Sequence, residues 1–307
     1  MASISVVIHG LGNIGKNVIH SLETAPDMEC LGVVRGKASL GTKKIDLRGL
    51  EDFESLEALV KAKGQPQAAI ICSPSRLVPE DARRYLAAGL HTIDSFDIHE
   101  QIPSVVENLG AAAAKAGRVS ITAAGWDPGT DSVMRALFEI MVPVGTTFTN
   151  FGRGRSMGHS AAARALEGVA DAVSLTIPLG GGRHSRLVYI LPKEDARPEA
   201  IRAALAADDY FAHDPLEVRF VADQAEMATV ADNSHGVLME HIGSSGQASN
   251  QRLSFDMRID NPALTGQILV SAARAATRLA PGCYTMLDIP LVAMLPGERM
   301  RQLARLV

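Results

Sequence analysis

The sequence predicts an α/β protein in which helices cover both faces of a doubly wound parallel sheet, followed by a second α+β domain. Three observations predict it. A glycine-rich turn joins the first apolar strand to a helix, strands and helices alternate up to residue 123, and strands dominate from Thr146 onward. Alternation is typical of parallel sheets, and consecutive strands are typical of antiparallel or mixed sheets. We therefore expect domains over residues 1–123 and 124–262, with 263–307 returning to the first.

The first strand and its turn indicate what the first domain binds. An apolar run from Ile4 to Ile8 is followed by Gly10, Gly12 and Gly15 in the spacing G-x-G-x-x-G, and then by a helix expected over Asn13–Ala25. The glycines allow a tight turn, close approach of a pyrophosphate and close packing of helix on strand. Strand, glycines and helix in this order are typical of a Rossmann-type dinucleotide-binding domain.

The second strand, Met28–Val34, carries the signal for the choice of dinucleotide. Arg35 follows it, 20 positions after Gly15, where an acidic residue would bind the ribose 2′-hydroxyl of NAD. Arginine suits a 2′-phosphate instead, so we expect NADP. The alternative is that Arg35 is only a solvated charge at a strand end.

Residues 42–64 are polar and helical in parts, with apolar residues too scattered to assign bounds, and the alternation then resumes. Ligands of such sheets bind beyond the carboxyl ends of the strands, so these ends should form one crevice. Further expected strands are Ala68–Cys72, His91–Ser95 and Arg118–Ala123, and further helices Val78–Ala88 and Pro103–Ala116. The expected cofactor-binding residues are Gly10, Gly12, Asn13, Ile14, Gly15, Arg35, Lys37, Ser73, Pro74, Ser75 and Arg76.

Beyond Trp126 the pattern changes to that of a mixed or antiparallel sheet. Its exposed face would suit contact with a second copy of the chain. The expected strands are Thr146–Phe151, Ala172–Ile177, Ser185–Leu191, Leu216–Ala222, Gly236–His241 and Arg252–Ile259, with helices over Thr130–Met141, Pro198–Ala207 and Asn261–Leu279.

Composition excludes several classes of protein. A net charge of −4 over 307 residues gives no basic surface for nucleic acid. The three cysteines are far apart and lack metal-ligand spacing, so we expect reduced thiols and no metal site. No apolar run approaches the roughly 20 residues of a membrane span, and no leader precedes the first strand. These features predict a soluble cytoplasmic protein.

Two strand ends carry side chains that suit an amine. Asp94 and Asp97 lie three positions apart after one strand, and Trp126 and Asp127 lie in a proline-glycine turn after the next. Carboxylates and an aromatic ring bind an ammonium group through charge-assisted hydrogen bonds and cation–π contact. The alternative is ordinary turn and capping chemistry.

The second domain offers groups that suit a carboxylate. Backbone amides of the glycine-rich stretch 152–160 could hold one. Arg186 lies within a strand and needs an anionic partner, which is either a ligand or a structural ion pair. His159 and His235, taken singly, are more often structural than ligand-binding.

Longer blocks of sequence carry a resemblance to a known family. They are GLGNIG, DSFDIH at Asp94–His99, GWDPGTDS at Gly125–Ser132, NFGRGRSMGHS at Asn150–Ser160, NQRLSFDM at 250–257 and NPALTGQ at 261–267. The chain resembles meso-diaminopimelate dehydrogenases nearly end to end. It is most similar to their shorter, broader-specificity branch, because Asn150-Phe151 replaces Phe-Trp and the loop after Arg186 is compact.

The resemblance implies NADP-dependent, reversible oxidative deamination of the D-centre of meso-2,6-diaminopimelate, within lysine and diaminopimelate metabolism. It implies that residues 124–262 bind substrate and form a homodimer. By position, Asp94, Asp97, Trp126 and Asp127 would hold the reacting amine, Met157 and Gly158 its carboxylate, Thr176, Arg186 and His235 the distal carboxylate, Asn261 the distal amine, and Phe151 would line the pocket. One departure is Gly36, where the family commonly has a second arginine; Lys37 is the nearby cation that could compensate.

Three other functions remain open. The chain could be a broad-specificity D-amino acid dehydrogenase, a related NADP-dependent reductase of the same fold, or a non-catalytic NADP sensor. The sequence has no HHxxK-like motif and no catalytic cysteine motif, which argues against the reductases. The intact set Asp94, Asp97, Trp126 and Asp127 argues against the sensor.

Overall fold

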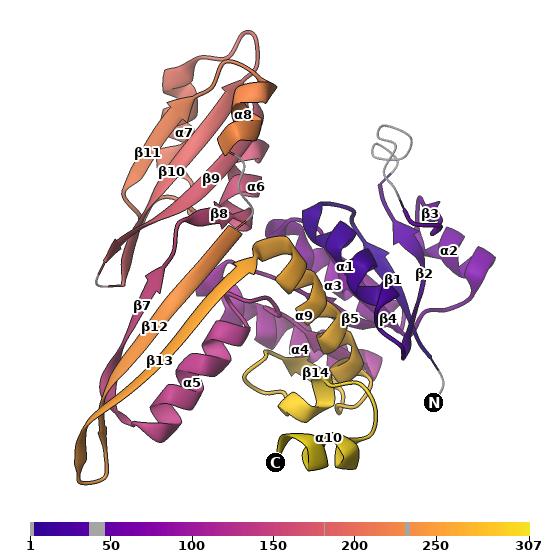
Figure 1. Ribbon diagram of the computed structural model, residues 1–307. Helices are drawn as coiled ribbons and strands as arrows, with labels where there is room; N and C mark the ends of the chain where they lie inside the picture. The colour runs from indigo at the N-terminus through magenta and orange to yellow at the C-terminus, as the bar shows by residue number, and fades with distance from the viewer. Residues whose placement is uncertain (1–2, 37–46, 181, 231–233) are drawn as a thin grey trace. The chain divides into compact units, whose positions relative to one another are not determined.

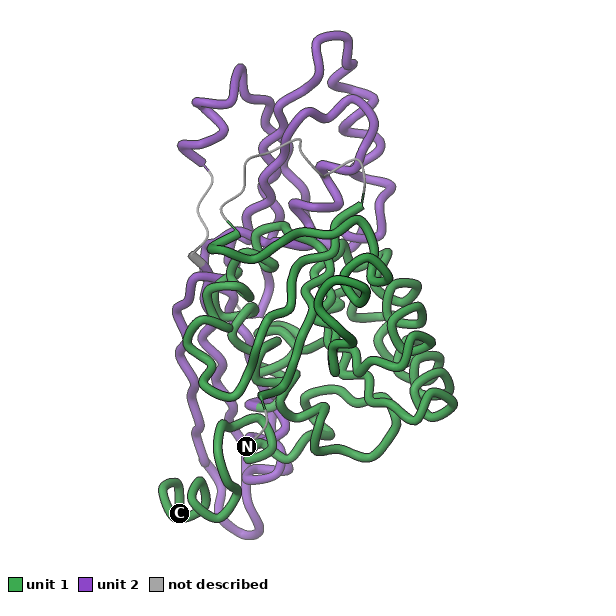
Figure 2. The backbone as a smooth tube through the Cα atoms, turned by 90° about the vertical axis from the view of Figure 1, so that its right-hand side faces the viewer, with its two compact units in different colours: residues 1–133, 262–307 green, residues 134–261 purple. Residues whose placement is uncertain are grey.

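A computed structural model describes residues 3–36, 47–180, 182–230 and 234–307 (Figure 1). Its contacts divide the chain into unit 1, Met1–Val133 with Pro262–Val307, and unit 2, Met134–Asn261 (Figure 2). The sequence placed the first boundary at residue 123. Contacts keep the next segment with unit 1, because the Ala124 amide still donates to the Asp94 carbonyl (2.9 Å) at the sheet edge.

Within the described part of unit 1, seven parallel strands form one sheet in the order β14-β6-β5-β4-β1-β2-β3. The order reverses between β1 and β4, because the chain builds outward from β1 through β2 and then returns to its other side. This confirms the predicted fold class. The strands are β1 (Ile4–His9), β2 (Met28–Val34), β3 (Asp52–Phe53), β4 (Ala68–Ile71), β5 (His91–Asp94), β6 (Val119–Ile121) and β14 (Gly282–Tyr284).

Side chains alternate along β1, and both of its faces are buried. Val7 packs with the helices of one face, α2, α3 and α4, whereas Val6 and Ile8 are fully buried on the other. Helices α1 and α9 pack closely together, since a Cβ on Gly266 would lie 2.9 Å from the Asn17 backbone. The helices are α1 (Asn13–Glu23), α2 (Leu56–Lys63), α3 (Val78–Ala87), α4 (Ile102–Ala116), α9 (Asn261–Ala276) and α10 (Arg299–Leu306), with short 3₁₀ turns η2 (Ser75–Leu77), η3 (His99–Gln101) and η4 (Leu291–Met294).

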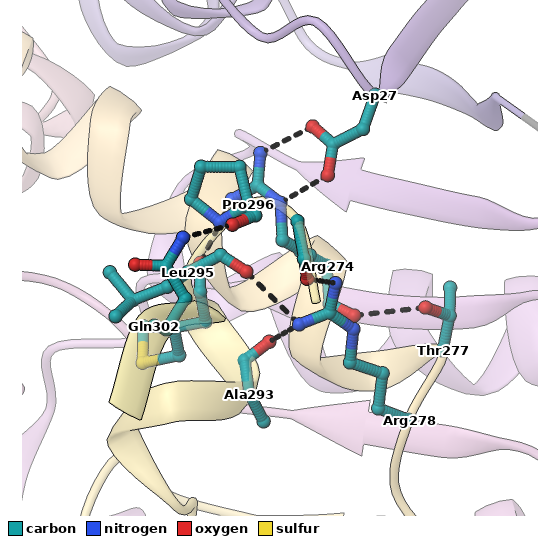
Figure 3. A network of polar contacts seen from close by, with 10 residues as sticks. Asp27, Arg274, Thr277, Arg278, Ala293, Leu295, Pro296 and Gln302 are labelled. Atoms are coloured by element: carbon teal, nitrogen blue, oxygen red, sulfur yellow. Dashed lines mark hydrogen bonds and ion pairs between the residues drawn. The ribbon is translucent and has the colours of Figure 1, made fainter. Parts of the chain in front are cut away.

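The C-terminal segment of unit 1 is tied to its N-terminal part by a buried ion pair (Figure 3). Arg274 of α9 donates from Nε and Nη2 to the two carboxylate oxygens of Asp27, at 2.6 and 2.7 Å, and from Nη1 to the Met294 carbonyl. The guanidinium holds the pKa of the Asp27 carboxyl below its usual range. Segments 247 positions apart in sequence are therefore joined by one side chain.

The described part of unit 2 contains two sheets, where the sequence predicted one. Strands β11-β10-β9-β8 form a mixed sheet and β13-β12-β7 an antiparallel one. The chain changes sheet at Gly152, whose amide donates to the Gly236 carbonyl. The elements are α5 (Thr130–Met141, beginning in unit 1), β7 (Val144–Phe151), β8 (Gly154–Ser156), α6 (Met157–Ala165), β9 (Val169–Gly180), β10 (Arg183–Pro192), α7 (Pro198–Ala207), β11 (Leu216–Phe220), α8 (Gln224–Val230), β12 (Ser234–Ser245) and β13 (Ala248–Asp260).

Both faces of the four-stranded sheet are covered. Val188 and Ile190 pack with α6 and α7 on one face, and Val173 and Leu175 pack with Met227 of α8 on the other. No helix among the described residues combines the length and apolar character that a membrane crossing needs.

Candidate functional site

The glycine turn lies where the strand order of the seven-stranded sheet reverses, between β1 and β4. The Cys72 amide donates to the His9 carbonyl there (2.7 Å), so the two strand ends are joined just before the turn. Gly10 has a φ of +90°, and a Cβ on it would lie 2.9 Å from the Cys72 carbonyl oxygen. A Cβ on Gly15 would lie 2.4 Å from the Gly10 carbonyl oxygen. Both positions therefore require glycine for packing.

Packing does not require glycine at position 12. A Cβ there would meet nothing within 4 Å, and its φ of −77° suits any residue. It is the N-cap of α1 and provides no side-chain cap, so Asn13 and Ile14 begin the helix beneath open space. A helix N-terminus with room above its amides fits the pyrophosphate of a dinucleotide.

The arginine expected at the 2′-phosphate already has a partner. Arg35 is buried and pairs with Asp52 of β3. The Arg35 amide also donates to the Phe53 carbonyl (2.9 Å), which holds this strand end against β3. A phosphate approaching Arg35 would therefore meet the Asp52 carboxylate too. Lys37, the other expected cation, lies outside the described residues.

The Ser73-Pro74-Ser75-Arg76 segment links the cofactor turn to the acidic segment after β5. Ser73 Oγ donates to Asp81 Oδ2 (2.7 Å), a carboxylate that also contacts His9 Nε2 (3.2 Å). Ser75 Oγ donates to Asp97 Oδ1 (2.6 Å). Pro74 and Arg76 are exposed. Residues expected at the cofactor and at the amine are therefore neighbours in unit 1.

Asp94 is a carboxyl group buried in unit 1. It is fully buried at the end of β5. Its Oδ1 accepts from Thr122 Oγ1 (2.8 Å), the Phe96 amide (3.0 Å) and the Ala123 amide (3.3 Å). Its Oδ2 is buried without a hydrogen-bond partner in the described parts of the chain. Burial raises the pKa of the Asp94 carboxyl to about 6, and the three donors oppose the rise.

The turn with the single tryptophan packs beside Asp94. The Gly125 amide donates to the Pro128 carbonyl (3.0 Å) and closes the turn, and a Cβ on Gly125 would lie 3.8 Å from Cβ of Ser95. Trp126 is 5% exposed, whereas Asp127 is half-buried. The four residues expected at the amine thus come from two adjacent turns at one sheet edge.

Unit 2 holds a separate cluster around Arg186 of β10. Its Nη1 donates to Thr176 Oγ1 of β9 (2.7 Å), and its Nε donates to Asp214 Oδ2 (2.7 Å). Its Nη2 lies 2.9 Å from His184 Nε2. The same His184 Nε2 lies 3.3 Å from Asp214 Oδ2, so the imidazole adjoins both the guanidinium and the carboxylate. Arg186 therefore has the structural ion pair that was one of its two expected roles, and its binding of a ligand stays a prediction.

Aromatic and imidazole rings complete this cluster. The Phe151 ring meets His184 and His235 edge to face, with centroids 5.4 and 6.2 Å apart. Burial, with the nearby Arg186 charge, lowers the pKa of His235 to about 4, and burial with Arg186 also lowers that of His184. The cluster therefore has neutral imidazoles around a cationic guanidinium. Its net charge depends on whether the Asp214 carboxylate is counted with it.

The remaining expected residues adjoin the short strand β8. Gly154 pairs with Thr176, and Asn261 Nδ2 donates to the Arg155 carbonyl (3.0 Å). Met157 and Gly158 begin α6 directly after β8. The N-cap residue of α6, Ser156, makes no side-chain capping hydrogen bond. Their amides are thus available to a carboxylate. His159 contacts Ser156 (2.8 Å) and packs between aromatic rings, which is a structural role.

Four residues at these sites were missed by sequence reasoning: Asp52, Thr122, His184 and Asp214. His184 had a signal, because it lies two residues from Arg186 on one strand and so shares its face. Asp214 contacts Arg186 across 28 positions of sequence, with no local pattern. Within residues 3–36, 47–180, 182–230 and 234–307, no three His, Cys, Asp or Glu side chains could hold a metal ion.

Two family models and several known proteins match the chain. A family described as "Oxidoreductase family, NAD-binding Rossmann fold" matches residues 4–94, and the "Diaminopimelic acid dehydrogenase C-terminal domain" matches residues 125–182. The chain is 43% identical to a meso-diaminopimelate D-dehydrogenase of Bacteroides fragilis, over all of both chains. It is 31% identical to one of Lysinibacillus sphaericus, over 96% of this chain and 97% of the other.

Solved structures are similar over the full length. A diaminopimelate dehydrogenase of C. glutamicum in complex with diaminopimelate is 28% identical, with a TM-score of 0.87 and full coverage of both chains. An engineered D-amino acid dehydrogenase bound to NADP⁺ is 26% identical, with a TM-score of 0.89 and the same coverage.

Proposed function

Because the chain belongs to the meso-diaminopimelate D-dehydrogenase family, we propose that it catalyses NADP-dependent, reversible oxidative deamination of the D-centre of meso-2,6-diaminopimelate. The products are L-2-amino-6-oxopimelate, which cyclises to tetrahydrodipicolinate, ammonia and NADPH. The observation that carries the proposal is the buried Asp94 carboxylate, whose Oδ2 has no hydrogen-bond partner among the described residues at the edge of a dinucleotide-binding sheet.

The substrate's ammonium group must lose a proton before its α-hydrogen can leave as a hydride. In this proposal Asp94, Asp97, Trp126 and Asp127 bind and orient the amine, and a carboxylate of this set takes up that proton. Hydrogen bonds that fix these residues support the proposal. Ser75 Oγ donates to the Asp97 carboxylate, and the Ala124 amide donates to the Asp94 carbonyl at the end of β5. NADP, when bound, supplies the hydride acceptor. Most of the protein's contribution is positioning.

Gly10, Gly12, Asn13, Ile14 and Gly15 hold the pyrophosphate in this proposal. The open space above Gly12 supports it. Ser73, Pro74, Ser75 and Arg76 line the same strand edge. Arg35 and Lys37 bind the 2′-phosphate, and the NADP⁺ complex of a similar structure supports that choice.

We assign binding of the other end of the substrate to the cluster around Arg186 in unit 2. We assign the distal carboxylate to Thr176, Arg186 and His235, the distal amine to Asn261, the reacting carboxylate to the Met157 and Gly158 amides, and a lining role to Phe151. The two ends of meso-diaminopimelate differ only in chirality, so an enzyme distinguishes them by holding both. Arg186 therefore serves specificity more than chemistry.

The experiment compares two substrates and two variants. With NADP⁺ as cofactor, NADPH formation is measured with meso-diaminopimelate, with D-alanine and without substrate. The same three reactions are run with NAD⁺, and NADH formation is measured. We expect Arg186→Ala to raise KM for diaminopimelate about 100-fold, since losing one partner of a buried charge pair costs about 2–5 kcal/mol. D-alanine lacks the distal carboxylate, so its KM should change little.

The matched control is Arg219→Ala on the adjacent strand, where an exposed arginine pairs with Glu217. It should leave both KM values unchanged. Equal effects of Arg186→Ala on both substrates would contradict the assignment. Turnover of D-alanine as efficient as that of diaminopimelate would favour a broad D-amino acid dehydrogenase instead.

We further propose a homodimer and a cytoplasmic location. The dimer is supported by the exposed face of the three-stranded sheet, where Val144, Phe148, Leu238 and Ile242 are all exposed. The location is supported by three free thiols at Cys30, Cys72 and Cys283. Recovery of the native enzyme outside the cytoplasmic fraction would contradict it.

A further inference from the structure

Strands β5 and β6, together with Thr122 directly after β6, carry two neighbouring polar pairs. They pair in parallel, with Thr92 opposite Ser120 and Ile93 opposite Ile121. Side chains two apart share a face, so Asp94 lies beside Thr92, and Thr122 lies beside Ser120. Thr92 Oγ1 donates to Ser120 Oγ (2.9 Å), and Thr122 Oγ1 donates to Asp94 Oδ1 (2.8 Å). The Thr92–Ser120 pair only joins the two strands, whereas the Thr122–Asp94 pair places a hydroxyl donor on a titratable carboxyl group.

The two oxygens of Asp94 have different surroundings. Oδ1 receives three donors: Thr122 Oγ1 and the amides of Phe96 and Ala123. A carboxylate oxygen with three donors has little capacity left. Oδ2 is buried and has no hydrogen-bond partner among residues that the structure describes. A proton or an ammonium hydrogen arriving at this carboxyl group therefore binds at Oδ2.

The backbone also serves this arrangement. Ala123 has a φ of +56°, in the left-handed region that non-glycine residues rarely adopt. In that conformation its amide points at Asp94 Oδ1. A strained residue at the end of a strand, aimed at a buried carboxylate, is typical of a functional site.

We propose that Thr122 is a positioning residue, which holds Asp94 Oδ1 so that the carboxyl group stays ionised and presents Oδ2 to the substrate amine. The inference rests on the proposed function. In the proton-transfer step an N–H bond of the substrate ammonium breaks, its electron pair stays on nitrogen, and an O–H bond forms at Asp94 Oδ2. The carboxylate becomes a carboxylic acid and the amine becomes neutral.

No positively charged group near Asp94 in the described part of the chain is among the causes of its pKa shift, so its hydrogen-bond donors keep the carboxyl group ionised. The titratable neighbours are Cys72 after β4 and Cys283 of β14, and burial raises the pKa of each thiol to about 12. Both are therefore neutral and supply no positive charge. Only the three hydrogen bonds at Oδ1 oppose the effect of burial on the Asp94 pKa. Removing one should make the carboxylate harder to ionise.

The test is the pH profile of kcat/KM for meso-diaminopimelate in three variants. Thr122→Val keeps the side-chain shape and removes the hydroxyl. We expect its acidic limb to move up by about one pH unit, as one hydrogen bond to a charged group implies. Activity then falls about tenfold at pH values below the limb and little above it. Thr122→Ser, which restores the hydroxyl, should return the limb to its original position.

Thr92→Val is the matched control, because it removes the equivalent hydroxyl from the neighbouring pair without touching Asp94. Its limb should not move. Thr122→Ala serves as the second deletion if the valine variant fails to fold, and NADPH binding with thermal melting reports folding. An unmoved limb in a folded deletion, or an equal shift in Thr92→Val, would overturn the inference. Full activity of Asp94→Asn would instead overturn the proposed role of Asp94 itself.

Discussion

At the scale of single residues, Asp94 shows a conflict between stability and function. Burial raises its pKa from 3.8 to about 6. Between those values the folded protein binds more protons than the unfolded chain, so this carboxyl group stabilises the fold at low pH and loses that effect as the pH rises through 6. The cost of keeping it ionised at neutral pH is about 3 kcal/mol for two pH units.

Asp94→Asn should therefore lose turnover and change the pH dependence of stability. Relative to the unmodified protein, the variant should gain about 2–3 kcal/mol between pH 4 and pH 7, because it lacks the titrating group. The measurement is the melting temperature of both proteins across that range.

Asp27→Asn is the control of opposite sign. The Arg274 guanidinium lowers the pKa of Asp27, so its stabilising effect is present at neutral pH and lost in acid. That variant should lose relative stability as the pH rises. Parallel melting curves for Asp94→Asn and the unmodified protein would show that Asp94 is not buried in its ionised form.

At the scale of elements, the glycine turn divides its work between packing and binding. Gly10 and Gly15 are required by contacts with backbone atoms, whereas Gly12 faces open space at the start of α1. The same three-glycine pattern thus contains two residues that serve the fold and one that we propose serves the ligand. The sequence alone could assign these roles only by analogy with the motif.

Gly12→Ala and Gly15→Ala should separate these roles. Gly12→Ala should weaken NADPH binding at least tenfold while the melting temperature changes little, because its backbone suits alanine. Gly15→Ala should destabilise the protein by about 1–3 kcal/mol through overpacking. Fluorescence titration with NADPH and thermal melting measure the two effects. Unweakened binding in Gly12→Ala would contradict the pyrophosphate site.

At the scale of the whole molecule, one face of the three-stranded sheet exposes apolar side chains among the described residues. Leu238 and Ile242 of β12 lie on the same face as Phe148 and Val144 of β7, as their pairing with Asn150 and Thr146 requires. All four are exposed. Clustered apolar side chains on a sheet face are typical of an interface between copies of a chain.

A double substitution, Leu238→Lys with Ile242→Lys, should convert the proposed dimer to a monomer. Two like charges on each copy would face each other across a symmetric interface. Light scattering coupled to size-exclusion chromatography measures the mass. Glu217→Lys, on an exposed strand outside this face, is the control. A monomeric unmodified protein, or a dimer that survives the double substitution, would contradict the proposal.

Local interactions explain how much could be predicted. The strand before Gly10, the helix after it and the alternation up to β6 depend on residues close in sequence, and the predicted fold class was confirmed. Helix Leu56–Lys63 lies in the stretch 42–64 that was expected to be helical in parts, and its bounds were not predicted because the apolar residues of that stretch are too scattered to show a period. The division of unit 2 into two sheets was missed, since strand pairing depends on distant segments.

The sequence by itself determined the parallel sheet, the glycine turn, and the positions of the acidic and basic residues at strand ends, because these follow from periodicity and backbone preference. Only the tertiary structure decided which side chains meet. Thr122 reaches Asp94, Asp214 reaches Arg186 and Asp52 reaches Arg35 because neighbouring strands and loops bring together residues that are far apart in the chain. The Thr122 contact opposes the rise in the pKa of Asp94, and the two carboxylates place a negative charge beside each arginine, which no local pattern of sequence encodes.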